Sequence, residues 1–150
     1  LFDAAASLAG IRQQVNYEAQ AAIEFEACLD PAENARYEFG IEAGTIRCGE
    51  AVQALLADIR SGMPAGVVSA RFHNGLAFLA GEVCTRLRDE TGLRDVALSG
   101  GVWQNMALLS RTVAELDRRG FILRLHRQVP ANDGCISLGQ VAIGTVRIES

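Results

Sequence analysis

Apolar residues recur at helical spacing over much of the chain. The longest stripe runs through residues 67–91 and predicts a helix with one face toward a core, formed by Phe72, Leu76, Leu79, Val83 and Leu87. Gly92 predicts the end of this helix. Shorter patterns of the same kind predict helices over residues 3–10, 17–29, 49–59 and 134–146.

Short apolar runs between these helices predict strands. The runs "DVALS" and "FILRLH" are separated by "VWQNMALLSRTVAELDRR", which predicts a helix whose inner face carries Met106, Leu109, Val113 and Leu116. Strand, helix, strand and helix in succession predict parallel pairing with right-handed crossovers, so the C-terminal half is expected to be α/β. Short β-prone runs around Glu42-Ala43-Gly44 predict a hairpin.

The composition is typical of one soluble globular domain, with 49% hydrophobic and 21% charged residues in 150. Apolar runs all fall short of the roughly 20 residues that span a bilayer, so we expect a cytoplasmic protein with no membrane partner. The four cysteines are widely spaced without a CxxC pair, which favours reduced, mostly buried thiols over a zinc site or disulfides. The chain starts at Leu1 within a helix-like stretch, and we expect it to be a piece of a longer polypeptide.

The net charge of -4 is unevenly distributed. Positions 1–50 hold nine acidic residues and three arginines, whereas positions 101–150 hold six arginines and four acids. This balance argues against broad nucleic-acid binding. Two explanations remain for a local basic face, which is either solvated helix surface or a binding site for an acidic partner. The face consists of Arg111, Arg118, Arg119, Arg124 and Arg127. All fourteen basic residues are arginine, which excludes a P-loop lysine and a lysine Schiff base.

Two loops follow the predicted strands at the edge where parallel sheets gather ligands, "SGG" and "QVPANDG". In the first, Gly100 and Gly101 remove side chains, and exposed N–H groups before a helix favour an anion. Asn105 can present its amide to a base or a ribose. Two glycines at such a turn are about as often a matter of tight packing alone.

The second loop offers Asp133, which as a hard oxygen ligand suits a metal that holds nucleotide phosphates in the same cleft. Capping of the last helix is the commoner role for Asn132 or Asp133 in this place. Four other residues could bind a ligand or act in catalysis, but a structural role is more common for each of them. These are His73 as a half-buried helix residue, His126 at a strand end, Trp103 in the core and Cys135 as a small packed residue.

The ordered segments "FDAAASLAG", "NYEAQAAIEFE", "RFHNGLA", "LSGGVWQN" and "HRQVPANDGCISLGQ" together resemble the C-terminal part of the HypF family, the hydrogenase-maturation carbamoyltransferases. The resemblance runs over nearly the whole chain, and the last two segments in combination are its most specific part. It implies an α/β fold with many helices, the RNase H-like lobe of the actin and sugar-kinase-like (ASKHA) fold. Residues 1–150 would be one domain, the C-terminal lobe of a larger carbamoyltransferase, with a helical segment over about 1–35 and an α/β core over about 36–150.

The resemblance also implies a function. In this family a preceding domain converts carbamoyl phosphate and ATP to carbamoyl-adenylate, and the carbamoyl group passes to the C-terminal cysteine of the partner HypE. By position, the adenylate would be met by Gly100 and Gly101 at the phosphate or ribose, Asn105 at the adenosine, and the carboxylates of Asp3 and Glu24 at the ribose hydroxyls. Asp133 would bind a divalent metal, iron, zinc or magnesium, completed by ligands outside this chain.

The same positions have ordinary structural explanations, because an N-cap role for Asp3 and a solvated helix face for Glu24 are about as common without the family. The chain also lacks the family's HxxxH metal pair and its acylphosphatase-like, zinc-finger and adenylate-forming segments. We therefore expect no turnover from the chain alone, which would need the missing N-terminal lobe and the upstream domains as partners. No catalytic residue is assigned to this chain.

Three other functions compete. A tRNA threonylcarbamoyl-transferase shares the fold, but it favours a "PGGP"-like stretch where this chain has "EAQAAIE", and a more basic face for nucleic acid. A small-molecule O-carbamoyltransferase lobe belongs to the same class. A non-catalytic docking module, whose arginine surface binds the HypE tail, is of a different class.

Overall fold

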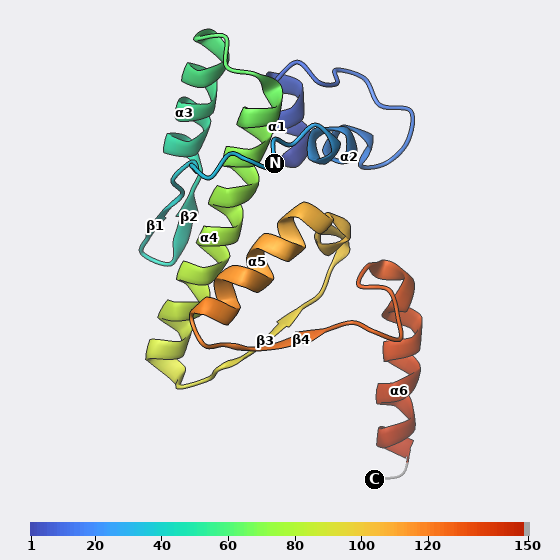
Figure 1. The fold of residues 1–150 in the computed structure, drawn as a ribbon. Coiled ribbons are helices and arrows are strands. Elements are labelled where there is room, and N and C mark those ends of the chain that lie inside the picture. The colour runs from blue at the N-terminus through green and yellow to red at the C-terminus, as the bar shows by residue number, and fades with distance from the viewer. Residues whose placement is uncertain (149–150) are drawn as a thin grey trace.

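A computed structural model describes residues 1–148, so the last two residues of the expected domain lie outside the described part. Its central element is α4 (Ala65–Thr91), a helix about 40 Å long at 1.5 Å per residue (Figure 1). The helix ends at Gly92, which has a φ of 75° in the left-handed region that glycine adopts without strain. The predicted long helix and its stop are confirmed.

Three helices surround the N-terminal half of α4, namely α1 (Phe2–Leu8), α2 (Gln20–Ala27) and α3 (Gly49–Arg60) (Figure 1). α2 begins later than its apolar pattern predicts, because its N-cap, Ala19, has a left-handed φ of 62° that an α-helix does not contain. These helices enclose the first core, made of Ala5, Ala6, Ala21, Phe25, Tyr37, Ala51, Leu55, Val68 and Phe72.

The predicted hairpin is present as β1 (Gly40–Glu42) paired antiparallel with β2 (Thr45–Arg47). Its two turn residues, Ala43 and Gly44, both have positive φ, of 47° and 78°. This geometry matches the right-handed twist of the two strands and closes the hairpin in two residues.

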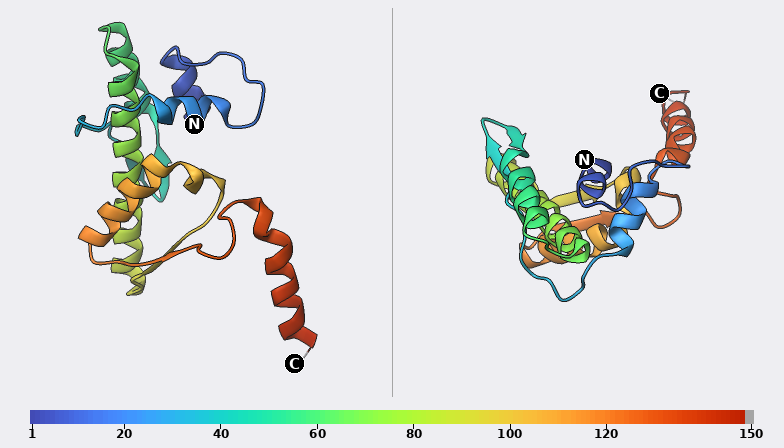
Figure 2. Two further views of the ribbon diagram at one scale, coloured as in Figure 1. Left: turned by 45° about the vertical axis from the view of Figure 1, so that its right-hand side comes forward. Right: turned by 90° about the horizontal axis from the view of Figure 1, so that it is seen from above.

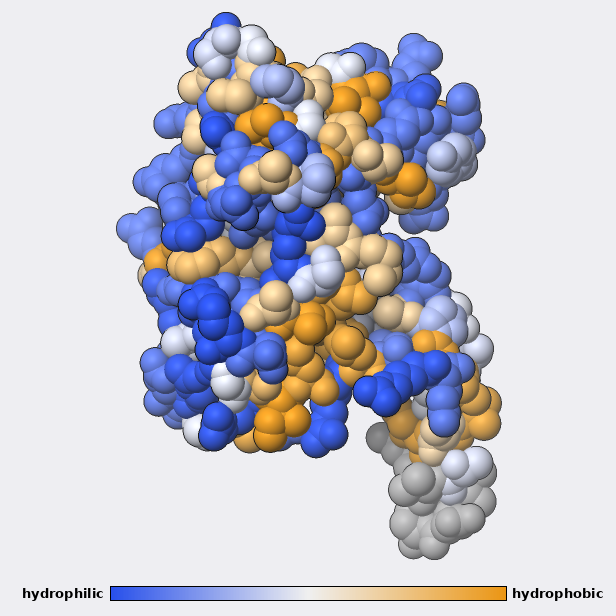
Figure 3. Space-filling model, viewed as in Figure 1, coloured by the Kyte–Doolittle hydropathy of each residue, from blue (hydrophilic) through white to orange (hydrophobic). Residues whose placement is uncertain are grey.

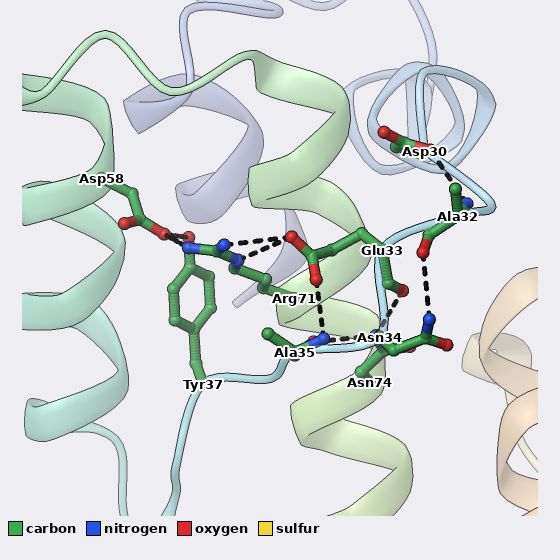
Figure 4. A network of polar contacts seen from close by, with 9 residues as sticks. All are labelled: Asp30, Ala32, Glu33, Asn34, Ala35, Tyr37, Asp58, Arg71 and Asn74. Carbon is green, nitrogen blue, oxygen red and sulfur yellow. Dashed lines mark hydrogen bonds and ion pairs between the residues drawn. The ribbon is translucent and has the colours of Figure 1, made fainter.

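An ion-pair network holds the extended segment before β1 against α4 (Figure 4). The Arg71 guanidinium lies 3.0 Å from Glu33 and 2.8 Å from Asp58, and the Tyr37 hydroxyl donates to the same Asp58 oxygen at 2.8 Å. Burial, followed by the hydrogen bond to Asp58, raises the pKa of the Tyr37 phenol, so it stays a donor. The Asn74 amide donates to two backbone carbonyls of the segment. The segment is thereby fixed without belonging to a sheet.

The second half contains β3 (Asp95–Leu98), α5 (Met106–Arg118) and β4 (Ile122–Leu125). β3 and β4 pair in parallel, from Asp95 opposite Ile122 to Leu98 opposite Leu125, which confirms the predicted α/β pairing. α5 packs against α4 and the strand pair around a second core of Leu98, Leu116 and Phe121. Trp103 packs against this core, as the sequence analysis favoured.

Four expectations about burial were wrong. Met106 is 62% exposed at the first residue of α5, whereas the other three residues of the predicted inner face, Leu109, Val113 and Leu116, lie in or against the second core. Leu87 is 52% exposed near the end of α4. His73 is completely buried rather than half-buried. The four cysteines are free, as predicted, but each is only partly buried.

The last helix, α6 (Ile136–Ile148), follows a short 3₁₀ helix, η2 (Asp133–Cys135), and extends away from the rest of the molecule (Figure 2). Figure 3 shows apolar surface on α6 and over the β3/β4 pair. Its exposed members include Ile122, Leu125, Ile136, Leu138, Val141 and Ile143. Parallel strands are normally covered on both faces. Because these side chains are exposed, one face of the β3/β4 pair is uncovered within residues 1–148. Within the same residues, no helix is long and apolar enough to cross a membrane.

Candidate functional site

Two adjoining cavities lie where α2, the "SGG" loop after β3 and the loop before α6 meet. The smaller, of about 290 Å³, is lined by Phe2, Glu26 and Asn105, and the larger, of about 520 Å³, by Glu18, Asn132 and Asp133. Both share walls from Ala19, Ile23, Gly101, Val102 and Gln104. The structure therefore places the "SGG" and "PANDG" segments in one cleft.

The two loop glycines have different surroundings. Gly100 has a φ of 114°, a conformation that L side chains rarely adopt, and its N–H donates to the carbonyl of Ala131 at 2.7 Å. That bond ties the two loops together, which supports a structural role for Gly100. Gly101 has no such strain and faces open space, because a Cβ there would meet only Asn132, at 4.0 Å. Gly101 is thus the glycine that leaves room in the cleft.

The capping role left open between Asn132 and Asp133 belongs to Asn132. Its Oδ1 accepts the N–H of Gly134 at 3.1 Å at the start of η2. The Asp133 carboxylate is exposed and lines the larger cavity. The Cys135 thiol donates to the Asn132 carbonyl at 3.3 Å and is packed in this turn.

Asp133 fits a metal site only in part. Within residues 1–148, no group of three or more His, Cys, Asp or Glu side chains is arranged to hold a metal ion. One carboxylate fits a site completed by ligands outside this chain, and not a site that this chain forms alone. The metal role of Asp133 remains a prediction.

The two carboxylates expected at the ribose do not line either cavity. Glu24 accepts two hydrogen bonds from Arg12, at 2.6 and 2.8 Å, and one from the Gln20 amide at 2.9 Å. The hydrogen bond from Arg12 lowers the pKa of the Glu24 carboxyl. Asp3 is exposed in the first turn of α1, whose N-cap is Leu1, so the N-cap explanation for Asp3 was wrong. The ribose role of both residues stays a prediction.

Glu26 is a cleft residue that the sequence analysis missed. It lies on the face of α2 toward the smaller cavity, and its Oε1 accepts the backbone N–H of Ala107 at 2.8 Å. A carboxylate at this place satisfies a free donor and complements the positive end of the α5 dipole. The contact joins residues 81 positions apart, and no local sequence pattern signals it.

Replacing Glu26 with alanine is expected to lower the free energy of unfolding by about 1–2 kcal/mol, because the Ala107 N–H loses a charged acceptor. Urea unfolding measures the change. The matched control is Glu18→Ala, since Glu18 lines the larger cavity but makes no side-chain hydrogen bond within the described residues. Equal stability of the two variants would contradict the capping role.

Three of the five arginines of the predicted basic face pair with carboxylates. Arg119 pairs with Glu82 and Glu115 at 2.7 Å, Arg118 pairs with Glu115, and Arg124 lies 2.9 Å from Asp95. Arg111 donates to the Asn74 side chain at 2.8 Å. The face therefore offers less free positive charge to an acidic partner than its arginine content suggests.

Known proteins resemble this chain along nearly its whole length. Residues 1–140 match the family described as "Carbamoyltransferase, Kae1-like Domain, second subdomain". The chain is 38% identical to a carbamoyltransferase HypF of Rhizobium leguminosarum bv. viciae and 31% identical to one of Synechocystis sp., covering 95% and 94% of this chain. It spans only 18% of the length of each of these relatives.

Solved structures give the same result. Full-length HypF in a phosphate- and nucleotide-bound form superposes with a TM-score of 0.89 and 36% identity, and HypF of T. kodakarensis with 0.81 and 27%. Each match covers 99% of this chain, and 20% and 19% of the respective solved chains.

Proposed function

Because the chain belongs to the HypF family of carbamoyltransferases, as the second subdomain of their Kae1-like domain, we propose that it forms the nucleotide-holding half of a carbamoyl-transfer site. Its fold is that of an α/β lobe of the ASKHA type, as the sequence resemblance implied. The observation that carries the proposal is the single cleft in which Gly101, Asn105 and Asp133 meet. The bound nucleotide named for the solved HypF structure supports the ligand class.

The ligand that we propose is carbamoyl-adenylate. Ile23 and Val102 give the cleft an apolar wall suited to a base, while Gly101 leaves space and Asn105 offers a polar group. Asp133 would hold a divalent metal together with ligands from the other lobe. Such a metal, when bound, neutralises the phosphate of the leaving AMP.

The acceptor that we propose is the C-terminal cysteine thiol of HypE. A bond forms between its sulfur and the carbamoyl carbon, the bond from that carbon to the phosphate oxygen breaks, and AMP leaves with the electron pair. The thiol proton passes to solvent. The described residues would bind and orient the adenylate, whereas its synthesis from ATP and carbamoyl phosphate belongs to upstream domains, so the chain alone is proposed to be inactive.

The competing functions have less support. The relatives reported above carry the name HypF, which favours this function over the tRNA-directed and small-molecule transferases. The pairing of Arg118, Arg119 and Arg124 with carboxylates weakens the argument for a docking module that binds an acidic partner without a nucleotide.

Asp133→Ala is expected to weaken the binding of AMP about tenfold in the presence of Mg²⁺ and to remove the effect of adding the metal. Calorimetric titration measures both, on this chain and on the chain rejoined to the first subdomain of its domain. Asp117→Ala, an exposed carboxylate on α5, is the control and should bind as the wild type does. An unchanged metal dependence in Asp133→Ala would contradict the metal role, and absence of AMP binding to the rejoined wild type would contradict the nucleotide function.

A further inference from the structure

His73 lies in the N-terminal half of α4 and is completely buried. Aromatic rings surround it, with the ring centroids of Phe2 and Phe25 at 5.1 and 5.8 Å. A polar ring enclosed in this way needs a hydrogen-bond partner for each nitrogen. The structure provides partners on both sides, the Ser69 carbonyl and, at 3.4 Å, the Ser69 hydroxyl at Nδ1, and Asn105 at Nε2.

The partners determine which nitrogen carries the proton. Nδ1 lies 2.8 Å from the backbone carbonyl of Ser69, which can only accept, so Nδ1 is the protonated nitrogen. A neutral imidazole has a single N–H, so Nε2 is an acceptor. It receives a hydrogen bond from the Asn105 amide nitrogen at 2.9 Å.

This contact and one other fix the Asn105 side chain. Its Oδ1 accepts the N–H of Leu108 at 2.7 Å, while its Nδ2 donates to His73. A flipped amide would place its oxygen against the lone pair of His73 Nε2 and its nitrogen against the Leu108 N–H. Within residues 1–148 the second N–H of Nδ2 has no partner, and Asn105 lines the smaller cavity.

We propose that His73 is a positioning residue for nucleotide recognition, which locks the Asn105 carboxamide so that the cleft offers an N–H donor to an acceptor atom of the nucleoside. The acceptor is a ring nitrogen or a hydroxyl oxygen. This inference rests on the proposed function for the identity of the ligand. The lock itself consists of the hydrogen bonds of Asn105 to His73 and Leu108, which are present in the unliganded chain.

Protonation of His73 would break the lock, because an Nε2–H would face the Asn105 N–H. Burial lowers the pKa of His73 below its ordinary value of 6.5, the Ser69 carbonyl raises it, Arg111 on α5 lowers it and Glu26 on α2 raises it. The folded chain therefore takes up this proton less readily than the unfolded chain. Stability from His73 is fully present above pH 6.5 and is lost progressively as the pH falls below that value.

The lock is tested by NMR of the 150-residue chain labelled with ¹⁵N only in histidine, which gives signals from His73 and His126 alone. We expect His73 to be neutral at pH 7, with the proton on Nδ1. In Asn105→Asp the acceptor of the Leu108 N–H remains but the donor to His73 is lost, so the pKa of His73 should rise. A proton on Nε2 in the wild type, or an unchanged pKa in Asn105→Asp, would overturn the lock.

Recognition is tested by calorimetry with AMP on the chain rejoined to its first subdomain. His73→Gln keeps an acceptor near the position of Nε2 and should bind within about twofold of the wild type, whereas His73→Phe should bind about tenfold more weakly. Thermal unfolding of both variants separates this effect from stability. If both variants bound AMP as tightly as the wild type, His73 would be only a core residue. If the wild type did not bind AMP, the proposed function would be contradicted. The NMR experiment would still test the hydrogen bonds between His73 and Asn105.

Discussion

Alanine at position 75 is expected to destabilise the chain by about 3 kcal/mol, although alanine is the better helix former by about 1 kcal/mol. Gly75 lies in α4 directly under the segment before β1, and a Cβ there would collide with the carbonyl oxygen of Tyr37 and lie 2.9 Å from the Phe39 ring. The carbonyl cannot rotate away, because the Tyr37 N–H donates to the Arg71 carbonyl at 3.1 Å and its hydroxyl is held by Asp58. The clash therefore costs more than the gain in helix propensity.

Urea unfolding measures this change as a lower midpoint at constant slope. Gly49→Ala makes the same chemical change at the start of α3, where a Cβ would meet nothing within 4 Å, and should stay within about 0.5 kcal/mol of the wild type. If Gly75→Ala were as stable as Gly49→Ala, the close approach of the segment to α4 would be wrong.

Leucine at position 101 is expected to weaken AMP binding about 100-fold or more, equivalent to about 2.7 kcal/mol. Gly101 lines both cavities, so a leucine side chain fills the space that the nucleotide would occupy. The fold should tolerate the change, because the φ of Gly101 is not positive and a Cβ meets only Asn132 at 4.0 Å. Binding and stability are thereby separated at one position.

Calorimetry and thermal unfolding of Gly101→Leu, side by side with Gly139→Leu, measure the two effects. Gly139 lies in α6 with open space around it and outside both cavities, so its variant should bind AMP normally. Normal AMP binding by Gly101→Leu would place the nucleotide elsewhere.

Features that depend on neighbouring residues were predictable from the sequence. The stripe from Phe72 to Val83 and the glycine at position 92 specify a helix and its end, and Ala43-Gly44 specifies a two-residue turn. The start of α5 was misplaced because Asn105 ends the preceding 3₁₀ helix, η1 (Gly101–Gln104), and caps the next helix. Met106 therefore lies at the exposed start of α5, whereas Leu109, Val113 and Leu116 lie in or against the second core as predicted.

From the sequence, only those site residues could be placed that lie in loops directly after the strands. Parallel strands bring their following loops to one edge, which is why Gly101 and Asp133 share a cleft. Pairs that join distant elements give no local signal, as with Arg12 and Glu24, Glu26 and Ala107, or His73 and Asn105. These pairs decide which polar groups are already engaged, and composition or spacing does not contain that information.

The long helix α4 contributes to both cores, with Val68 and Phe72 in the first and Cys84 beside the second. The cleft lies between elements of the two halves, since α2 belongs to the first and the loop after β3 to the second. A ligand in the cleft binds only when both halves are folded. Because it binds the folded chain and not the unfolded chain, it shifts the folding equilibrium toward the folded chain. Thermodynamic linkage would thus spread the stabilisation across the whole cooperative unit and not confine it to the loops that the ligand touches.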